Sequence, residues 1–348
     1  MCAAVRSVGA RAQGAPGEEG TSGVAAQRSV TREVAVFADR LEAIVTNVEQ
    51  AIQGKGDAIR LALVCLLAEG HLLIEDVPGV GKTSLAKSLA ASLELSWHRI
   101  QFTPDLLPSD VTGVVVYNRS NNSFDFRPGG IFANIVLGDE INRASPKTQS
   151  ALLEAMEERQ VTVDATTYPL AAPFLVIATQ NPVEHEGTYP LPESQLDRFL
   201  MRIEMGYPDR TAEISMLDAH AGSSAVESLS PVASVADVTE MIALSRQVHV
   251  APVLKGYLVD LAAATRRHPA ATLGVSPRAT LALQRASRAY AASIGREYIV
   301  PDDIKALTRP VLSHRLVLTP EAEMSGATTD QVLADVLASV PVPSGRPG

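Results

Sequence analysis

Short apolar runs alternate with longer amphipathic segments through the first half of the chain. The apolar runs predict strands at 71–75, 97–102, 134–139 and 174–179. Apolar positions at helical spacing predict helices at 32–50, 57–69, 82–94 and 146–158. Because helices and strands that alternate in this way build a layered fold, we expect an α/β domain with a mostly parallel sheet over residues 29–206.

The pattern changes after Arg202. From there onward apolar positions recur at helical spacing, as at Leu258, Leu261, Ala262 and Thr265. We expect a separate, all-helical domain over 207–330 and a C-terminal segment over 331–348 that ends in a frayed tail rich in Pro, Gly and Ser. Ser276 before Pro277 is expected to cap one of the helices.

Two β-hairpins are expected within the α/β domain. Apolar and polar residues alternate at 114–119 and 123–126 around an Asn-rich turn. A second alternating run at 160–164 precedes a turn at 165–167.

Composition and charge narrow the classes of function. Residues 1–28 are rich in Ala, Gly, Ser and Arg without apolar periodicity, so we expect a disordered leader. The longest apolar runs, such as 61–68, are too short to span a bilayer and no secretory signal is visible, so a cytoplasmic location is expected. The formal net charge of −9 gives no electrostatic footprint for nucleic acid, which disfavours a nucleic-acid motor.

A glycine-bearing loop between a strand and a helix, at 74–83, carries the first candidate chemistry. Loops of this kind wrap backbone N–H groups around nucleotide phosphates. The ATP site is assigned to Asp76, Pro78, Gly79, Val80, Gly81, Lys82, Thr83 and Ser84. Lys82 is expected to reach the β and γ phosphates, and the Thr83 hydroxyl to bind Mg²⁺. The strict pattern G-x-x-x-x-G-K-S/T has glycine where this chain has Asp76, which leaves an ordinary strand-to-helix turn as the alternative.

Two carboxylates follow the apolar run at 134–139. Asp139 is expected to hold Mg²⁺, largely through water, and Glu140 to orient and polarise the attacking water. The alternative is an acidic helix N-terminus exposed to solvent. Together with the glycine-bearing loop, the pair predicts ATP hydrolysis.

Several further motifs resemble those of the MoxR family of AAA+ ATPases. They are D-E-I-N-R-A at 139–144, P-K-T-Q-S-A-L-L-E-A-M-E-E at 146–158, A-T-Q-N-P at 178–182, G-T-Y-P-L-P-E-S-Q-L-D-R-F at 187–199 and G-V-S-P-R-A at 274–279. The resemblance covers 52–315. It implies a P-loop AAA+ domain followed by a helical lid domain.

The resemblance also implies roles for residues that spacing alone does not assign. Asn181 would sense the γ-phosphate, although an Asn before Pro182 is also a common turn residue. Arg198 would be the arginine finger that reaches a neighbouring subunit's ATP, with an ion pair to Asp197 or Glu193 as the alternative. By the same resemblance, Arg278 would be the second sensor, an arginine that the lid domain supplies to the nucleotide. Gln53 and Gly54 would lie against the adenine.

The function that the resemblance implies is ATP-driven remodelling by a ring of subunits, expected to be a hexamer. The client would be a partner protein, such as one with a von Willebrand factor A domain, whose maturation, assembly or metal insertion depends on the ATPase. The two hairpins would face that client. Two alternatives stay open: a metal-chelatase-like or nucleic-acid motor, and a nucleotide-switched binding module with negligible turnover.

Overall fold

A parallel sheet lies at the centre of the molecule. The computed structural model describes residues 19–181, 188–208, 210–211, 213–214 and 226–343, with 19–32 described by their backbone path alone. Within this part of the chain, five parallel strands form one sheet in the order β2-β5-β8-β1-β9. The strands are β1 (Leu72–Glu75), β2 (Trp97–Gln101), β5 (Ile135–Asp139), β8 (Leu175–Gln180) and β9 (Met201–Ile203). The predicted α/β fold with a parallel sheet is confirmed.

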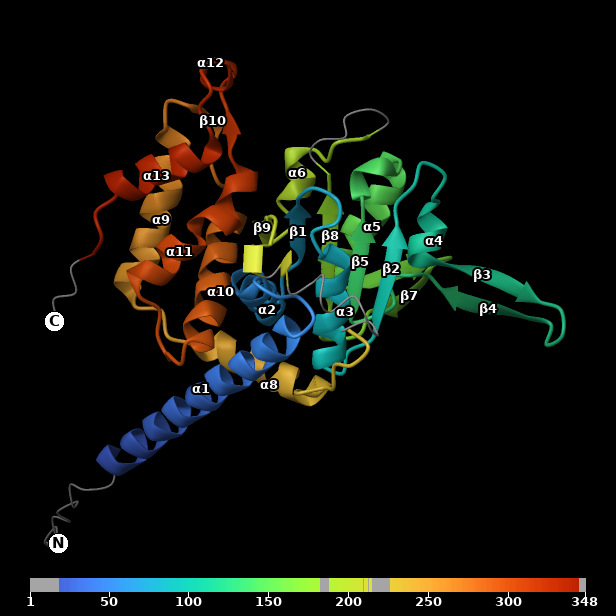
Figure 1. Ribbon diagram of the computed structural model, residues 1–348, viewed down its shortest axis with the longest axis horizontal. Helices are drawn as coiled ribbons and strands as arrows, with labels where there is room; N and C mark the ends of the chain where they lie inside the picture. The colour runs from blue at the N-terminus through green and yellow to red at the C-terminus, as the bar shows by residue number, and fades with distance from the viewer. Residues whose placement is uncertain (1–18, 182–187, 209, 212, 215–225, 344–348) are drawn as a thin grey trace, which may run out of the picture.

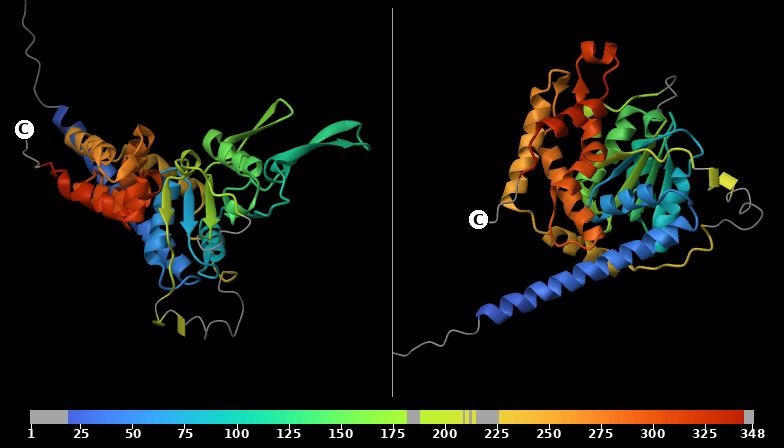
Figure 2. Two further views of the ribbon diagram at one scale, coloured as in Figure 1. Left: turned by 90° about the horizontal axis from the view of Figure 1, so that it is seen from above. Right: turned by 60° about the vertical axis from the view of Figure 1, so that its left-hand side comes forward.

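Helices cover both faces of this sheet (Figures 1 and 2). In the α/β part they are α1 (Glu19–Glu49), α2 (Gly56–Leu67), α3 (Lys82–Ser92), α4 (Pro108–Thr112), α5 (Pro146–Glu158) and α6 (Glu193–Leu196), with a 3₁₀ turn at Ile141–Arg143. The predicted boundaries of α5 are correct, and those of α2 and α3 differ by one or two residues. Ser145 caps α5 by accepting a hydrogen bond from the Thr148 N–H, as a residue before a first-turn proline often does.

The strands are buried on both faces because their alternate side chains enter two different cores. Leu72, Ile74 and Ile135 pack with the side of the molecule that carries α1, α2, α3 and the helical domain. Leu73 and Val136 pack with α4 and α5. The parallel pairing of β5 with β8 and of β8 with β1 places the carboxyl ends of these three strands beside one another at one edge of the sheet.

A helical domain follows β9 and lies beside the sheet (Figure 1). Its helices are α8 (Val235–Gln247), α9 (Pro252–Arg267), α10 (Pro277–Ser293), α11 (Pro301–Leu312), α12 (Pro320–Met324) and α13 (Thr329–Ser339), with a 3₁₀ turn at Ser313–Arg315. Ser276 caps α10 as predicted, accepting from the Ala279 N–H at 3.1 Å.

Two details of this domain differ from the sequence prediction. It is not all-helical, because β10 (Ala271–Leu273) and β11 (Val317–Leu318) form an antiparallel pair too short to leave a periodic signal. The boundary predicted at residue 330 falls inside α13, whose Val332, Leu333 and Val336 are buried in the main core. The helical domain therefore extends to Ser339.

Helix α1 begins earlier than predicted. The structure continues it back to Glu19, so the prediction of a disordered leader is wrong for residues 19–28. The strong helix formers at 25–28 and the absence of proline between residues 17 and 77 allow the helix to extend back to Glu19, although that extension lacks apolar periodicity. Residues 1–18 and 344–348, which include most of the predicted leader and part of the frayed tail, lie outside the described residues.

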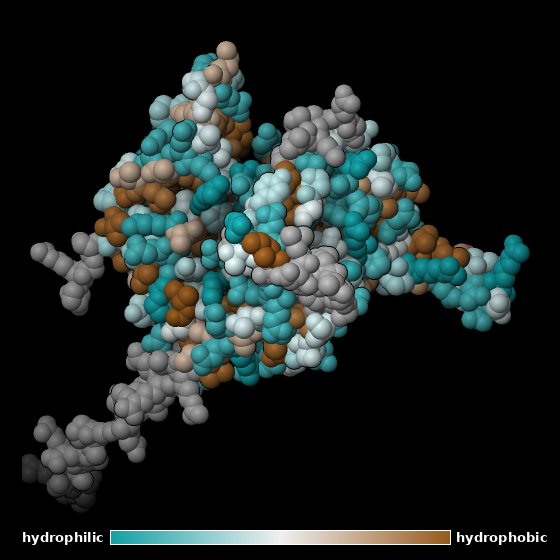
Figure 3. Space-filling model, viewed as in Figure 1, coloured by the Kyte–Doolittle hydropathy of each residue, from teal (hydrophilic) through white to brown (hydrophobic). Residues whose placement is uncertain are grey.

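Both predicted hairpins are confirmed, and they project from the side opposite the helical domain (Figures 1 and 2). The longer one pairs β3 (Gly113–Asn118) with β4 (Ser123–Pro128), and we call it the β3–β4 arm. The shorter one pairs β6 (Gln160–Val163) with β7 (Thr166–Pro169). The rings of Phe126 and Tyr168 stack at 3.8 Å and join the two hairpins. Figure 3 shows hydrophobic residues on the arm behind a hydrophilic tip, and Phe124 is 74% exposed.

None of the helices in the described part of the chain has the length and apolar composition needed to cross a membrane. Cys65 is buried in α2, and burial raises the pKa of its thiol, as expected for a core cysteine.

One buried histidine makes stability depend on pH. The Val176 N–H donates to Nδ1 of His71 at 3.0 Å, so Nε2 carries the hydrogen and donates to the Met156 carbonyl at 3.0 Å. Burial lowers the pKa of His71 to about 3. Between that value and the unfolded pKa of about 6.5, the unfolded chain binds a proton that the folded chain does not, so stability falls as pH falls.

We expect wild-type protein to lose about 1.4 kcal/mol more unfolding free energy than His71→Gln between pH 7.5 and pH 5.5, because the variant lacks this protonation. Urea unfolding at the two pH values measures the difference. His98→Gln, at an exposed site, should retain the wild-type loss. Equal losses in wild type and His71→Gln would contradict the role of this ring.

Candidate functional site

The loop between β1 and α3 has two glycines in a left-handed conformation. Gly79 has φ +86° and Gly81 has φ +97°. A Cβ on Gly79 would meet nothing within 4 Å, and one on Gly81 would meet Ile52 and Met205 only at 3.9 Å. The backbone conformation, and not lack of space, therefore requires glycine at both positions.

The same loop turns the N-terminus of α3 toward a cavity. Gly81 is the N-cap of α3, and no side chain caps the first N–H groups of the helix. Those N–H groups and the helix dipole favour an anion at this end. The cavity has a volume of about 390 Å³ and is lined by Pro78, Gly79, Gly81, Lys82, Thr83, Ser84, Arg99, Asp139, Glu140, Thr179 and Asn181.

Lys82 lies at the mouth of the loop. Its Nζ donates to the Asp76 carbonyl in a very short contact and to the Gln180 carbonyl at 3.3 Å. Burial lowers the pKa of Lys82, while the nearby carboxylates of Asp76, Asp139 and Glu140 oppose that change. The ammonium is thus partly desolvated, so a phosphate that reached it would form a charge-assisted hydrogen bond.

The two carboxylates predicted for catalysis line the same cavity. Asp139 ends β5, and its Oδ1 accepts from the Thr179 hydroxyl at 2.6 Å. That hydroxyl in turn accepts from the Glu140 N–H at 2.9 Å. Glu140 has φ +56°, an uncommon conformation for a side chain of this size, and its carboxylate accepts from Gln101 at 3.0 Å and Arg143 at 3.1 Å.

Asn181 follows directly after β8. It is 7% exposed and lines the cavity together with Lys82 and Glu140. The carboxyl ends of β1, β5 and β8 therefore bring together the lysine, the acidic pair and the amide that were assigned from the sequence.

Five residues assigned to the nucleotide do not line this cavity: the four described here and Arg278, which lies elsewhere. The Asp76 carboxylate points instead to backbone N–H groups, at 2.8 Å from Met205 N and 2.6 Å from Gly206 N. Val80 is buried in the core. Gln53 and Gly54 lie just after Ile52, which approaches the loop at Gly81, but neither of them contributes to the cavity. Their expected contact with adenine stays a prediction.

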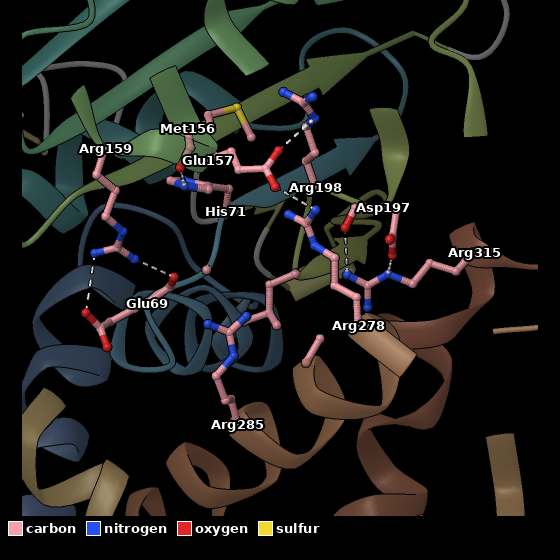
Figure 4. Close-up of a pocket in the computed structure, with 13 residues that line it drawn as sticks. Glu69, His71, Met156, Glu157, Arg159, Asp197, Arg198, Arg278, Arg285 and Arg315 are labelled. Carbon is pink, nitrogen blue, oxygen red and sulfur yellow. Dashed lines mark hydrogen bonds and ion pairs between the residues drawn. The ribbon is translucent and has the colours of Figure 1, made fainter. Parts of the chain in front are cut away.

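Arg198 and Arg278 lie together at a second, smaller cavity of about 120 Å³ (Figure 4). Both arginines bind Glu157, at 3.3 Å for Arg198 Nε and 2.8 Å for Arg278 NH1. Arg198 thus pairs neither with Asp197 nor with Glu193. Arg278, expected at the nucleotide, is absent from the cavity of its own chain.

This second cavity lies at the opposite end of β1 from the glycine loop. His71, just before β1, and Leu200, just before β9, line it. A four-residue strand of about 13 Å therefore separates it from the glycine loop. Five arginines surround it: Arg159, Arg198, Arg278, Arg285 and Arg315. They outnumber its carboxylates, Glu69, Glu157 and Asp197, so this surface suits an anion.

Sequence reasoning missed the residues that hold the acidic pair. Arg99 binds Asp139 through two nitrogens, at 2.6 and 3.1 Å, and Gln101 binds Glu140. Both come from β2, whose register places Arg99 opposite Leu137 and Gln101 opposite Asp139. The polar residues at 98, 99 and 101, in a segment predicted to be a strand of the sheet, were the available signal. Glu157 was missed because the spacing within α5 does not show what packs against it.

The fold and the nucleotide-site geometry define a P-loop protein of the AAA+ class. The model of the family described as "ATPase family associated with various cellular activities (AAA)" matches residues 71–201, and that of the AAA lid domain matches 263–336. The chain is 50% identical to the protein YeaC of Bacillus subtilis over 87% of this chain and 94% of that protein. It is 39% identical to the chaperone MoxR1 of Mycobacterium tuberculosis, over 87% and 82% of the two chains.

A crystal structure of a candidate ATPase from Cytophaga hutchinsonii superposes with a TM-score of 0.85 at 38% identity. The match covers 91% of this chain and 99% of that one. The chain belongs to the MoxR family of AAA+ ATPases.

The residues of the cavity fit a nucleotide with Mg²⁺. A left-handed glycine loop, an uncapped helix N-terminus and Lys82 suit the phosphates, while the Thr83 hydroxyl and the Asp139 carboxylate are oxygen ligands of the kind that Mg²⁺ takes. Among the described residues no cluster of three or more His, Cys, Asp or Glu side chains could hold a metal.

Proposed function

We propose that this chain hydrolyses ATP with Mg²⁺ in the cavity beside the glycine loop and uses the energy to remodel partner proteins. The observation that carries the proposal is the meeting of Lys82, Thr83, Asp139, Glu140 and Asn181 in that one cavity. A binding site alone needs the lysine and the loop. A carboxylate and an amide beside them add the means to orient a water.

Each residue has a distinct part in the proposed reaction. Lys82 and the N–H groups of α3 hold the phosphates, and Thr83 with Asp139 would hold Mg²⁺, which neutralises charge on the phosphate oxygens when bound. Glu140 accepts a proton from the attacking water. Asn181 donates to the γ-phosphate from its side-chain amide.

The two arginines of the second cavity are proposed to act on a neighbouring subunit's nucleotide. They cannot reach their own, because β1 separates them from the glycine loop. Head-to-tail contact of identical subunits would bring the second cavity of one to the first cavity of the next, and such contacts close into rings. Glu157 would hold Arg198 and Arg278 until phosphate replaces it.

Assembly should therefore control turnover. We expect the specific ATPase activity to fall steeply when the protein is diluted below its assembly concentration, while nucleotide affinity changes little, because a lone subunit keeps its glycine loop but lacks the neighbour's arginines. Activity measured across a dilution series, with molecular mass followed by light scattering, tests this. Constant specific activity below assembly would contradict action between subunits, and absence of any ATPase activity would contradict the proposed function itself.

The client is proposed to be a protein met at the two hairpins. The β3–β4 arm exposes Phe124 and Tyr117, whose rings lie 5.2 Å apart, on the side away from the helical domain. We place the reaction in the cytoplasm and expect a hexameric ring. Maturation, assembly or metal insertion of a client, such as one with a von Willebrand factor A domain, is the role proposed from the family.

A further inference from the structure

The chain segment that leaves β9 is held from two sides by charged groups, one buried and one partly buried. Met205, Gly206 and Tyr207 form this segment, which begins the connection between the sheet and the helical domain, and we call it the exit segment. Its N–H groups face one charged residue and its carbonyl groups face another.

Asp76 binds the N–H side. One carboxylate oxygen accepts from the N–H of Met205 at 2.8 Å and of Gly206 at 2.6 Å. The other accepts from the Val77 N–H at 2.8 Å. Asp76 occupies the position where the strict phosphate-loop pattern has glycine, and these contacts give a reason for a carboxylate there.

Lys55 binds the carbonyl side. Its Nζ donates to the carbonyl oxygens of Met205 at 2.7 Å, Gly206 at 2.9 Å and Tyr207 at 2.7 Å. The residue is only 8% exposed, and all three ammonium hydrogens have an acceptor. Burying a charge is costly unless it is fully hydrogen-bonded, so this geometry is a specific arrangement and not a solvated surface contact.

The exit segment is also tied to the phosphate-binding groups. The Asp76 carbonyl accepts the Lys82 ammonium, so a single residue contacts the exit segment with its side chain and the phosphate-binding lysine with its backbone. The Met205 side chain lies 3.9 Å from the point that a Cβ on Gly81 would occupy. Two contacts therefore connect Lys82 to the exit segment. The Lys82 ammonium binds the Asp76 carbonyl, and the Asp76 carboxylate binds the N–H groups of Met205 and Gly206.

We propose that Lys55 and Asp76 are positioning residues that couple the nucleotide loop to the helical domain through the exit segment. The pair is named the Lys55–Asp76 clamp. When phosphate enters the loop, it competes with the Asp76 carbonyl for the Lys82 ammonium. The resulting shift of Asp76 moves the exit segment, which Lys55 keeps rigid, and with it the adjoining Glu204, whose carboxylate lies 3.6 Å from Arg309 of α11 in the helical domain. This inference rests on the nucleotide binding proposed above.

The test compares nucleotide affinity with lid movement in the full chain. Fluorescent dyes placed at Lys147→Cys on α5 and Met324→Cys on α12, in a Cys2→Ser background with Cys65 left buried, report the distance between the two domains by energy transfer. Lys55→Met and Asp76→Asn each remove one side of the clamp while nearly preserving side-chain size. Lys87→Met, at an exposed lysine of α3, is the matched control.

At saturating ADP, both clamp variants should show less than about half of the nucleotide-induced change in energy transfer, and Lys55→Met should keep its affinity for ADP within about threefold of wild type. The double variant should lose no more than either single one, because the two residues act on one segment. Lys87→Met should respond as wild type does. An unchanged response in both clamp variants, with normal ADP binding, would overturn the clamp alone.

A measurement on wild-type protein covers the case in which the variants do not fold. Hydrogen exchange at the Met205 and Gly206 amides should be slow without nucleotide, because both donate to Asp76, and should change at least about tenfold when ADP binds. Exchange that ignores ADP while ADP binds would overturn the clamp. Failure of wild-type protein to bind ADP would overturn the proposed function and the clamp with it.

Discussion

Glu140→Gln should hydrolyse ATP about 10² to 10⁴ times more slowly than wild type while binding ATP as tightly, because only the proton acceptor for the attacking water is lost. At 1.36 kcal/mol per decade this corresponds to roughly 3 to 5 kcal/mol of barrier. Glutamine keeps the shape and can still accept from Gln101 and Arg143. Bound ATP should therefore leave the variant by dissociation and not by hydrolysis.

Steady-state phosphate release and equilibrium binding of a fluorescent ATP analogue separate the two effects. Glu154→Gln, at an exposed carboxylate of α5, is the matched control and should hydrolyse ATP at the wild-type rate. Turnover by Glu140→Gln within a factor of a few of wild type would reject the role of Glu140 and favour a switch that does not depend on hydrolysis. A client that remains bound to the ATP-loaded variant could then be identified by pull-down.

Arg198→Ala should reduce ATP turnover by about 10³ to 10⁵ without a matching loss of ATP affinity. The arginine would stabilise charge on the transferring phosphoryl group of a neighbour, and its loss would raise the barrier by roughly 4 to 7 kcal/mol. Its own subunit's cavity does not contain Arg198, so binding there should be preserved.

A mixing experiment decides whether Arg198 acts between subunits. Arg198→Ala and Glu140→Gln are each expected to be inactive, but a site with Glu140 from one chain and Arg198 from its neighbour is complete. A mixture of equal amounts of the two single variants should recover about a quarter of wild-type activity if subunits mix at random in a head-to-tail assembly, because one junction in four then has both residues. The double variant mixed with either single variant should recover none. No recovery in the mixture of single variants, with mixing verified by mass, would place the arginine outside the neighbour's site.

The core of the fold could be predicted because its signals are local. Apolar runs of strand length, amphipathic segments and the left-handed glycines at 79 and 81 each follow from neighbouring residues. Asp139 and Glu140 were found for the same reason, since a pair of carboxylates after a buried strand is visible in ten residues of sequence.

The remaining features depend on contacts between distant residues. Asp76 is 129 and 130 positions from its N–H partners, Met205 and Gly206, and no local pattern reveals that pairing. Arg278 and Glu157 are 121 positions apart. The β10–β11 pair joins segments that are each too short to show a period. Such features are fixed by contacts between segments that lie far apart in the chain, which a single sequence does not display.

The stacked contact between Phe126 and Tyr168 fastens the two hairpins at their bases, while the loop at 119–122 contributes no side chain to either cavity. Substitutions in that loop can therefore accumulate over generations without altering hydrolysis. After gene duplication, copies that differ in this loop would keep the same ATPase site and bind different client proteins.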